Sequence, residues 1–237
     1  MKTLGIVGGL GPESTIDYYR SLISVYRRKT DNAGYPRVII VSLDVDEGIR
    51  MLNAGELAQL AEYQGAAIRQ LAAAGADFAL ISANSGHIVF DDMQRASPLP
   101  LVSIVETACD EVARHGLRNV ALLGTRFTMT GRFYPEVFDK RGIRLVTPSP
   151  EEQDYIHQKY INELLLGNFL PETREGLQQI IQQMKERDRI EGVILAGTEL
   201  PLILRADSIA GLPLFDTTQI HVNAAVDEML NGMTESA

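Results

Sequence analysis

Short apolar runs rich in β-branched residues alternate along this chain with longer stretches of helical periodicity, and this alternation restricts the possible folds most strongly. The runs predict strands at residues 4–7, 38–43, 78–81, 101–103, 120–123, 144–146, 193–195 and 214–215. The stretches between them predict helices at 13–27, 55–74, 105–114, 151–166, 172–187 and after Phe215. This pattern is typical of an α/β protein with largely parallel sheets.

Two short polar segments follow predicted buried strands, one in each half of the chain. The first polar segment is residues 82–87 (SANSGH) and the second is residues 196–200 (AGTEL). Parallel sheets bind ligands beyond the carboxyl ends of their strands, and the hydroxyl, amide and N–H groups of these segments suit a small anion. Either segment alone is also consistent with a helix cap.

A weak internal repeat predicts two similar lobes. Residues 5–9 resemble residues 121–125, and the distance to the following polar segment is 75 positions from Val7 to Ser82 and 73 from Leu123 to Ala196. We therefore expect two pseudo-symmetric α/β lobes, each a mainly parallel sheet flanked by helices, with the active site in the cleft between them. The predicted first lobe is 1–105 plus 214–237, and the second is 106–213.

Composition excludes several classes of protein. The net charge of −9 is unfavourable for nucleic acid and for anionic membrane surfaces. Cys109 is the single cysteine, so an intramolecular disulfide and a thiol-rich metal site are excluded, and the chain offers no histidine spacing typical of a metal site. No apolar stretch approaches a membrane span and the N-terminus does not read as a signal peptide. We expect a cytoplasmic protein.

A glycine-rich turn at residues 8–15 (GGLGPEST) follows the first predicted strand. A dinucleotide fingerprint would need a third glycine where Ser14 stands, and the next suitable acid, Asp44, comes too late. A turn that holds a small anion and a purely structural turn both remain possible. Arg126 follows the Gly124-Thr125 strand end and is a candidate for gripping a substrate carboxylate.

These motifs together resemble the aspartate/glutamate racemase family, and the resemblance covers essentially the whole chain. It is carried by residues 8–15, 84–87, 122–129, 198–200 and 215–221. It implies two α/β lobes, a homodimer, no cofactor, no metal, and a small acidic amino acid or dicarboxylate as the partner. The implied substrate-binding residues are Gly9, Leu10, Asn84, Ser85, Thr125, Arg126 and Thr198.

The sequence departs from the family at the positions that carry the chemistry. Family members place one cysteine before Asn-Thr in the first segment and another before Thr-Glu in the second, and the two thiols exchange the Cα proton on opposite faces. Ala83 and Gly197 occupy these positions here. Neither can hold a proton, so His87 and Glu199 are the candidate substitutes. Ser85 replaces the usual threonine, and Gly86 replaces a bulkier residue and is expected to enlarge the pocket.

Three functions are compatible with this pattern. The first is an enzyme of the racemase superfamily with altered, thiol-free acid/base chemistry, acting as an isomerase or as a lyase or decarboxylase. The second is an inactive homologue that binds a carboxylate as a sensor or partner. The third is an engineered racemase, which the additional changes at Ser85 and Gly86 disfavour.

Overall fold

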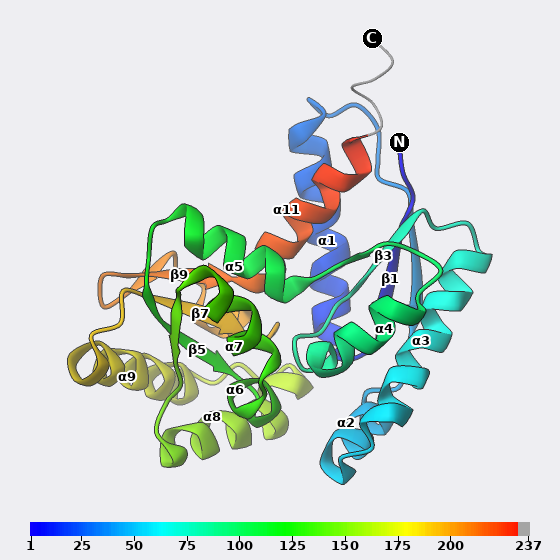
Figure 1. Cartoon of the computed structure of the whole chain (residues 1–237). Helices are drawn as coiled ribbons and strands as arrows, with labels where there is room; N and C mark the ends of the chain where they lie inside the picture. Colours follow the sequence, from blue (N-terminus) through cyan, green and yellow to red (C-terminus); the bar gives the residue numbers. More distant parts are fainter. Residues whose placement is uncertain (232–237) are drawn as a thin grey trace. The chain divides into compact units, whose positions relative to one another are not determined.

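The computed structural model describes residues 1–231, and this part of the chain divides into two compact units (Figure 1). Unit 1 contains Met1–Ile104 and residues 218–231, and unit 2 contains Val105–Thr217. Each unit has its own sheet, so the predicted α/β class with two sheets is confirmed.

The sheet of unit 1 has four parallel strands in the order β2-β1-β3-β4. The strands are β1 (Leu4–Gly8), β2 (Val38–Ser42), β3 (Phe78–Ile81) and β4 (Leu101–Val102). The helices are α1 (Pro12–Lys29), α2 (Val45–Ala54), α3 (Leu57–Ala73), α4 (Phe90–Ala96) and α11 (Thr217–Leu230), with a 3₁₀ turn at Ser85–Val89. Every residue of β1 and β3 is buried, as expected for central strands covered on both faces.

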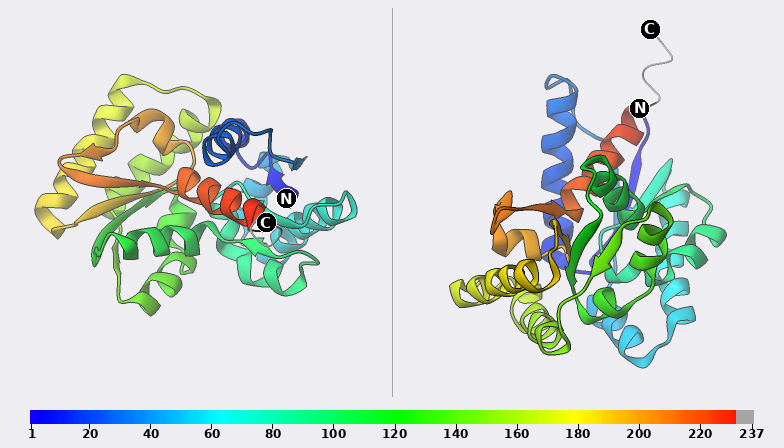
Figure 2. Two further views of the ribbon diagram at one scale, coloured as in Figure 1. Left: turned by 90° about the horizontal axis from the view of Figure 1, so that it is seen from above. Right: turned by 60° about the vertical axis from the view of Figure 1, so that its left-hand side comes forward.

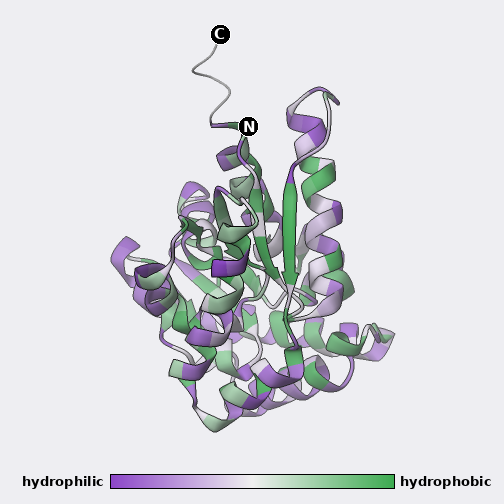
Figure 3. Cartoon of the chain, turned by 90° about the vertical axis from the view of Figure 1, so that its right-hand side faces the viewer, coloured by the Kyte–Doolittle hydropathy of each residue, from purple (hydrophilic) through white to green (hydrophobic). Residues whose placement is uncertain are grey.

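Helices cover both faces of this sheet. On one face, α1 and α11 lie side by side and pack against Leu4 and Ile6 of β1 (Figures 1 and 2). On the other face, α2, α3 and α4 pack against Val7 and Ile81. Apolar residues concentrate on the strands and on the helix faces turned toward them, while polar residues are found on the outer helix faces (Figure 3). Helical spacing of Tyr18, Leu22 and Val25 produces the buried face of α1.

The sheet of unit 2 has five strands in the order β6-β5-β7-β9-β8. The strands are β5 (Asn119–Gly124), β6 (Arg144–Val146), β7 (Gly192–Ala196), β8 (Ser208–Ile209) and β9 (Leu212–Asp216), and all pairs are parallel except β8 with β9. The helices are α5 (Ile104–Arg114), α6 (Arg126–Thr130), α7 (Phe133–Phe138), α8 (Pro150–Asn162), α9 (Pro171–Asp188) and α10 (Leu200–Leu204), with 3₁₀ turns at Asp139–Arg141 and Leu164–Leu166. Side chains of α8, α9 and α10 form one core with β5 and β7.

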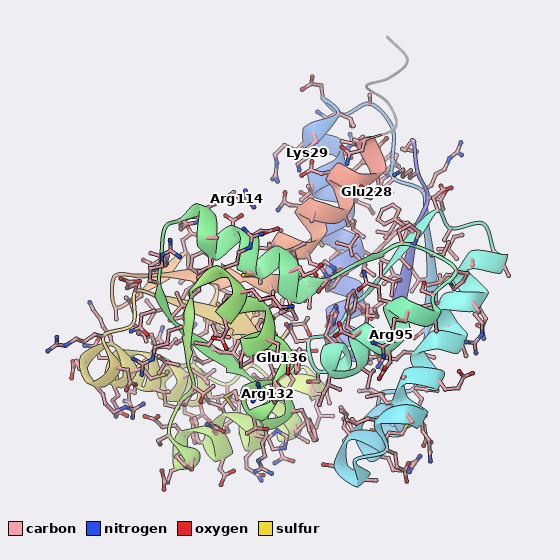
Figure 4. All side chains as sticks on the ribbon, in the orientation of Figure 1. Lys29, Arg95, Arg114, Arg132, Glu136 and Glu228 are labelled. Atoms are coloured by element: carbon pink, nitrogen blue, oxygen red, sulfur yellow. The ribbon has the colours of Figure 1, made fainter. Side chains whose placement is uncertain are left out.

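Exposed ion pairs line the helices of both units. Arg132 Nε lies 3.1 Å from Glu136 Oε1 one turn along α7, and Lys29 Nζ at the end of α1 lies 2.6 Å from Asp227 Oδ1 of α11 (Figure 4). Exposed pairs of this kind contribute little to stability because water and salt screen them. The hydrophobic cores therefore carry most of the stabilisation.

The two sheets repeat one strand order, because β2-β1-β3-β4 corresponds to β6-β5-β7-β9. Val7 of β1 pairs with Ile81 of β3, and Leu123 of β5 pairs with Leu195 of β7. The first polar segment follows β3 and the second follows β7. Each segment thus occupies the equivalent strand end of its own unit.

Several details differ from the sequence-based expectations, and the short helices α6 and α7 are among the elements that were not predicted. A separate helix, α2, begins at an Asp44 cap and ends at Gly55, whose φ of 68° is left-handed, so the predicted 55–74 helix begins later at Leu57. The two-residue strand β8 was not predicted. Residues 214–217 lie in unit 2, because β9 pairs with β7, whereas the predicted boundary placed them in the first lobe.

Candidate functional site

The glycine-rich turn of unit 1 is tightly built. Gly9 has a φ of +78°, and a Cβ at this position would lie 2.1 Å from the Leu43 carbonyl oxygen. The Gly9 N–H donates to Thr15 Oγ1 at 2.9 Å, so it is engaged within the turn. Leu10 packs against the apolar core beneath α2 and α3. Both residues therefore have structural contacts of their own, and their predicted contact with substrate stays a prediction.

Ser82 joins the glycine-rich turn to the first polar segment. Its N–H donates to the Val7 carbonyl at 3.0 Å, and its carbonyl accepts a hydrogen bond of 3.0 Å from Ser14 Oγ. Its hydroxyl lies 3.2 Å from the Val7 carbonyl and 3.4 Å from Thr15 Oγ1. These bonds fix the ends of β1 and β3 and the start of α1 as one rigid edge of the unit 1 sheet.

The first polar segment forms a short 3₁₀ turn. Ala83 presents a buried methyl group and Asn84 is also buried, while the His87 N–H donates to the Asn84 carbonyl at 2.9 Å. A Cβ at Gly86 would lie 2.9 Å from Oε1 of the buried Gln64, and Gln64 Nε2 lies 3.4 Å from the Gly86 carbonyl. The prediction that Gly86 enlarges a pocket is therefore wrong, because the Gln64 carboxamide fills the space beside it.

His87 is held as a neutral ring. Its Nε2 accepts a hydrogen bond of 3.2 Å from the Ile104 N–H, so the proton is on Nδ1, which donates to the Ala83 carbonyl at 2.8 Å. Burial is the main cause that lowers the pKa of His87 to about 3, and the nearby His221 lowers it further. Both ring nitrogens are engaged with the backbone, so the structure gives no support to His87 as a substitute for a thiol.

His221 of α11 also has both ring nitrogens hydrogen-bonded, with the donor and acceptor roles reversed. Its Nε2 donates to the Val102 carbonyl at 2.9 Å, so its Nδ1 accepts from the Tyr18 hydroxyl at 2.9 Å. Burial lowers the pKa of His221 to about 4. The ring centroids of His87 and His221 are 6.1 Å apart. This pair is a structural feature of unit 1.

Thr125 and Arg126 follow β5 in unit 2. Thr125 is the N-cap of the short helix α6, and its Oγ1 accepts from the Thr128 N–H at 3.4 Å. The Arg126 guanidinium is half-exposed and ion-paired with Asp154 of α8 at 2.6 Å, while its backbone N–H donates to His157 Nδ1 at 3.3 Å. A substrate carboxylate would have to compete with Asp154 for Arg126.

The second polar segment lies against Tyr160 of α8. A Cβ built on Gly197 would lie 2.6 Å from Tyr160 Cε2. The Tyr160 hydroxyl donates to Glu199 Oε2, and Thr198 Oγ1 donates to the same oxygen at 2.8 Å. Thr198, Glu199 and Tyr160 are all buried. The structure thus brings a carboxylate and two hydroxyl donors together at the end of β7.

Sequence reasoning missed Tyr160. The residue recurs with Ile156 and Leu164 at four-residue intervals, which is the ordinary signal of a buried helix face, and all three do belong to the core of unit 2. Nothing local in the sequence indicates that its hydroxyl reaches Glu199. Cys109 is buried with its Sγ 4.0 Å from the Val137 carbonyl oxygen, and burial raises the pKa of its thiol.

Within residues 1–231, no group of three or more His, Cys, Asp or Glu side chains is arranged to hold a metal ion. A separate search of the helices in that described part finds none that is both long and apolar enough to cross a membrane.

Comparison with known proteins gives a consistent family. The Bacillus subtilis broad specificity amino-acid racemase RacX is 25% identical over 238 residues, covering 96% of this chain and 98% of RacX. A crystal structure from Yersinia pestis, provisionally assigned as an Asp/Glu racemase, superposes with a TM-score of 0.87 at 32% identity and covers 97% of this chain and 100% of that one. An aspartate racemase homologue from Pyrococcus horikoshii gives a TM-score of 0.82 at 35% identity, covering 97% and 99%.

The sequence profile of the Asp/Glu/Hydantoin racemase family matches residues 7–225. That range includes the glycine-rich turn, both polar segments and most of α11. The chain belongs to the Asp/Glu/Hydantoin racemase family.

Proposed function

We propose that this protein binds a small acidic amino acid or dicarboxylate and exchanges its Cα proton through Glu199, without a thiol. Family membership and the full-length similarity to amino-acid racemases support an amino-acid substrate. The observation that carries the proposal is the buried Glu199 carboxylate, which accepts hydrogen bonds from Tyr160 and Thr198 beside Gly197.

The chemistry requires a group that can take up and return a proton within hydrogen-bond reach of Cα. In the proposed step the Cα–H bond breaks, its proton forms an O–H bond with the Glu199 carboxylate, and its electron pair is delocalised into the neighbouring carboxyl group of the substrate. Return of a proton from Glu199 restores the C–H bond. Racemisation needs a second proton carrier for the opposite face of Cα, and the methyl group of Ala83 is unable to serve as one.

The groups proposed to bind the substrate are the glycine-rich turn of unit 1 and polar residues that follow the strand ends. They are Gly9, Leu10, Asn84, Ser85, Thr125, Arg126 and Thr198. That these residues serve one ligand stays a prediction, as do the homodimer, the cytoplasmic location and the absence of a cofactor.

A second candidate function is carboxylate binding without catalysis. The engagement of both His87 nitrogens favours it, because the first polar segment then offers only a methyl group, an amide and a hydroxyl near the family cysteine position. The protein would in that case act as a sensor or partner of the kind expected for an inactive family member.

Deuterium exchange separates the two functions. The protein is incubated in D₂O with L-aspartate, D-aspartate, L-glutamate or D-glutamate, and loss of the Cα–H signal is followed by NMR while binding is measured by calorimetry. Exchange of one of these substrates supports the proposed carbanion chemistry. Binding with no exchange above the protein-free rate contradicts it and supports the inactive binder.

A further inference from the structure

Gly197 is glycine because of a neighbouring side chain and not because of its backbone. Its φ lies outside the left-handed region, so an L-residue would be unstrained there. A Cβ at this position would lie 2.6 Å from Cε2, 3.2 Å from Cζ and 3.2 Å from Oη of Tyr160. Any side chain at 197, a cysteine included, therefore requires the Tyr160 ring to move.

Tyr160 is fixed at both ends. Its ring belongs to the core formed by α8, α9, α10 and the unit 2 sheet, and the side chain is 5% exposed. Its hydroxyl donates to Glu199 and lies 3.5 Å from the Glu199 N–H. A ring packed in a core and bonded at its tip has one preferred position, so relaxation away from a new Cβ is costly.

The direction of the hydrogen bond follows from charge. Burial, together with the charge of the Glu199 carboxylate, raises the pKa of the Tyr160 phenol well above its usual value. The phenol therefore stays protonated and donates, and the carboxylate accepts. Tyr160 cannot be the proton acceptor of the pair, whereas Glu199 can.

We propose that Tyr160 is a positioning residue that replaces the side chain missing at position 197: its ring fills the volume of that side chain, and its hydroxyl orients Glu199 toward the substrate. The role of the hydroxyl rests on the proposed function of Glu199. The role of the ring does not, since it concerns packing alone. The two parts therefore need separate measurements.

The ring is tested by a double-mutant cycle on thermal stability. Gly197→Ala is expected to lower Tm by roughly 3–10 °C in the wild type and in Tyr160→Phe, because both keep the ring. In a Tyr160→Ala background the same substitution should cost little more, because the ring is gone. If Tyr160→Ala does not fold, Tyr160→Leu is used as the ring-free background instead, because it keeps an apolar residue in the core.

Gly176 of α9 provides a matched control in the same unit. A Cβ there would lie 2.1 Å from the Tyr155 hydroxyl oxygen, so it is another glycine that faces a tyrosine of α8. The change in Tm on Gly176→Ala should be the same with and without Tyr160. Equal losses from Gly197→Ala in the presence and absence of the Tyr160 ring would overturn the proposal.

The hydroxyl is tested by the pH profile of Cα deuterium exchange. Removal of one donor to the charged carboxylate in Tyr160→Phe is expected to shift the acidic limb of the profile upward by roughly 1 pH unit. A purely structural role would lower the rate at every pH without moving the limb. Tyr155→Phe serves as the control and should leave the limb in place.

The outcomes distinguish two failures. A wild-type protein that binds acidic amino acids without any exchange refutes the proposed function of Glu199, while the thermal cycle still decides the role of the ring. A wild-type protein that exchanges, with an unchanged limb in Tyr160→Phe, refutes the positioning role of the hydroxyl and leaves the proposed function standing.

Discussion

Glycine is required at different positions of this protein for different physical reasons, although the positions look alike in the sequence. Gly9 has a left-handed φ and a backbone oxygen where its Cβ would be, whereas Gly197 has an ordinary φ and an aromatic ring beside it. The sequence indicated correctly that the turn after the first strand needs glycine, because a GGLG run leading to Pro12 reads as a tight turn. It could not indicate the reason for Gly197, which depends on Tyr160 in another element.

Gly9→Ala should lower the free energy of unfolding by about 2–4 kcal/mol, since left-handed strain and overlap with Leu43 add together. Gly34→Ala is the matched control, because Gly34 has a φ of +80° and nothing within 4 Å of its Cβ position. It should cost only about 1 kcal/mol. Urea denaturation of both variants measures the difference, and equal losses would show that the Leu43 contact is relieved without cost.

Cys109 should behave as a core residue. The thiol is 1% exposed, and burial raises its pKa, so little reactive thiolate is present at neutral pH. We expect native protein to react slowly with an alkylating reagent, at a rate that rises in urea. Cys109→Ala should leave Cα exchange unchanged. Rapid labelling of native protein together with loss of exchange would place the chemistry at Cys109.

At the scale of elements, the apolar pattern was sufficient for every strand of the two sheets except β8. Buried runs such as 78–81 and 193–195 were found because they are continuous and β-rich. Helix α2 was missed because its short amphipathic pattern runs almost directly into the longer α3, and only Glu56 and the left-handed Gly55 separate them. Strand β8 was missed because Ser208 and Ile209 do not form an apolar run.

The buried histidines of unit 1 should make stability depend on pH. The folded-state pKa values of about 3 for His87 and about 4 for His221 lie below the ordinary histidine pKa of about 6.5. Between these folded-state pKa values and pH 6.5, the unfolded chain therefore binds more protons than the folded chain. The contribution of the two histidines to the free energy of unfolding is fully present above pH 6.5 and is lost as the pH falls toward 4. Between pH 7 and pH 5 the free energy of unfolding should fall by roughly 2–4 kcal/mol.

The pH effect is measured by urea denaturation of wild type and variants between pH 5 and pH 8. The two rings face each other, and their hydrogen-bond partners are the Tyr18 hydroxyl, the Ile104 N–H and the carbonyls of Ala83 and Val102, while the Phe90 ring stacks on His87. His221→Gln should reduce the pH dependence, and the exposed His115→Gln should not. Equal pH dependence in all three proteins would show that these histidines are not its source.

At the scale of the whole molecule, the two-unit architecture was predictable and the chemistry was not. The repeated spacing between strand and polar segment reflects one strand order used twice. The candidate site of unit 2 depends instead on contacts between α8 and the end of β7, which lie 39 residues apart at Tyr160 and Glu199. Periodicity reports which face of a helix is buried but not which side chain a buried hydroxyl reaches.

Wild-type protein should racemise aspartate and glutamate slowly or not at all. The resemblance to the family implies a pair of thiols at the positions that Ala83 and Gly197 occupy here, and a single proton carrier would return its proton to the face from which it came. Chiral chromatography of each enantiomer after prolonged incubation measures this. Turnover in the ordinary enzyme range of roughly 1–10³ per second would mean that a second proton carrier acts on the opposite face.

The role of Glu199 is tested most directly by the Cα deuterium exchange rate of Glu199→Gln, with Glu151→Gln, an exposed substitution in α8, as the control. The amide keeps the size of the side chain but cannot accept the Cα proton. Glu199→Gln should still bind the substrate and should lose exchange by roughly 10²–10⁴-fold, while Glu151→Gln exchanges at the wild-type rate. Exchange at the wild-type rate in a folded, substrate-binding Glu199→Gln protein would contradict Glu199 as the group that handles the proton.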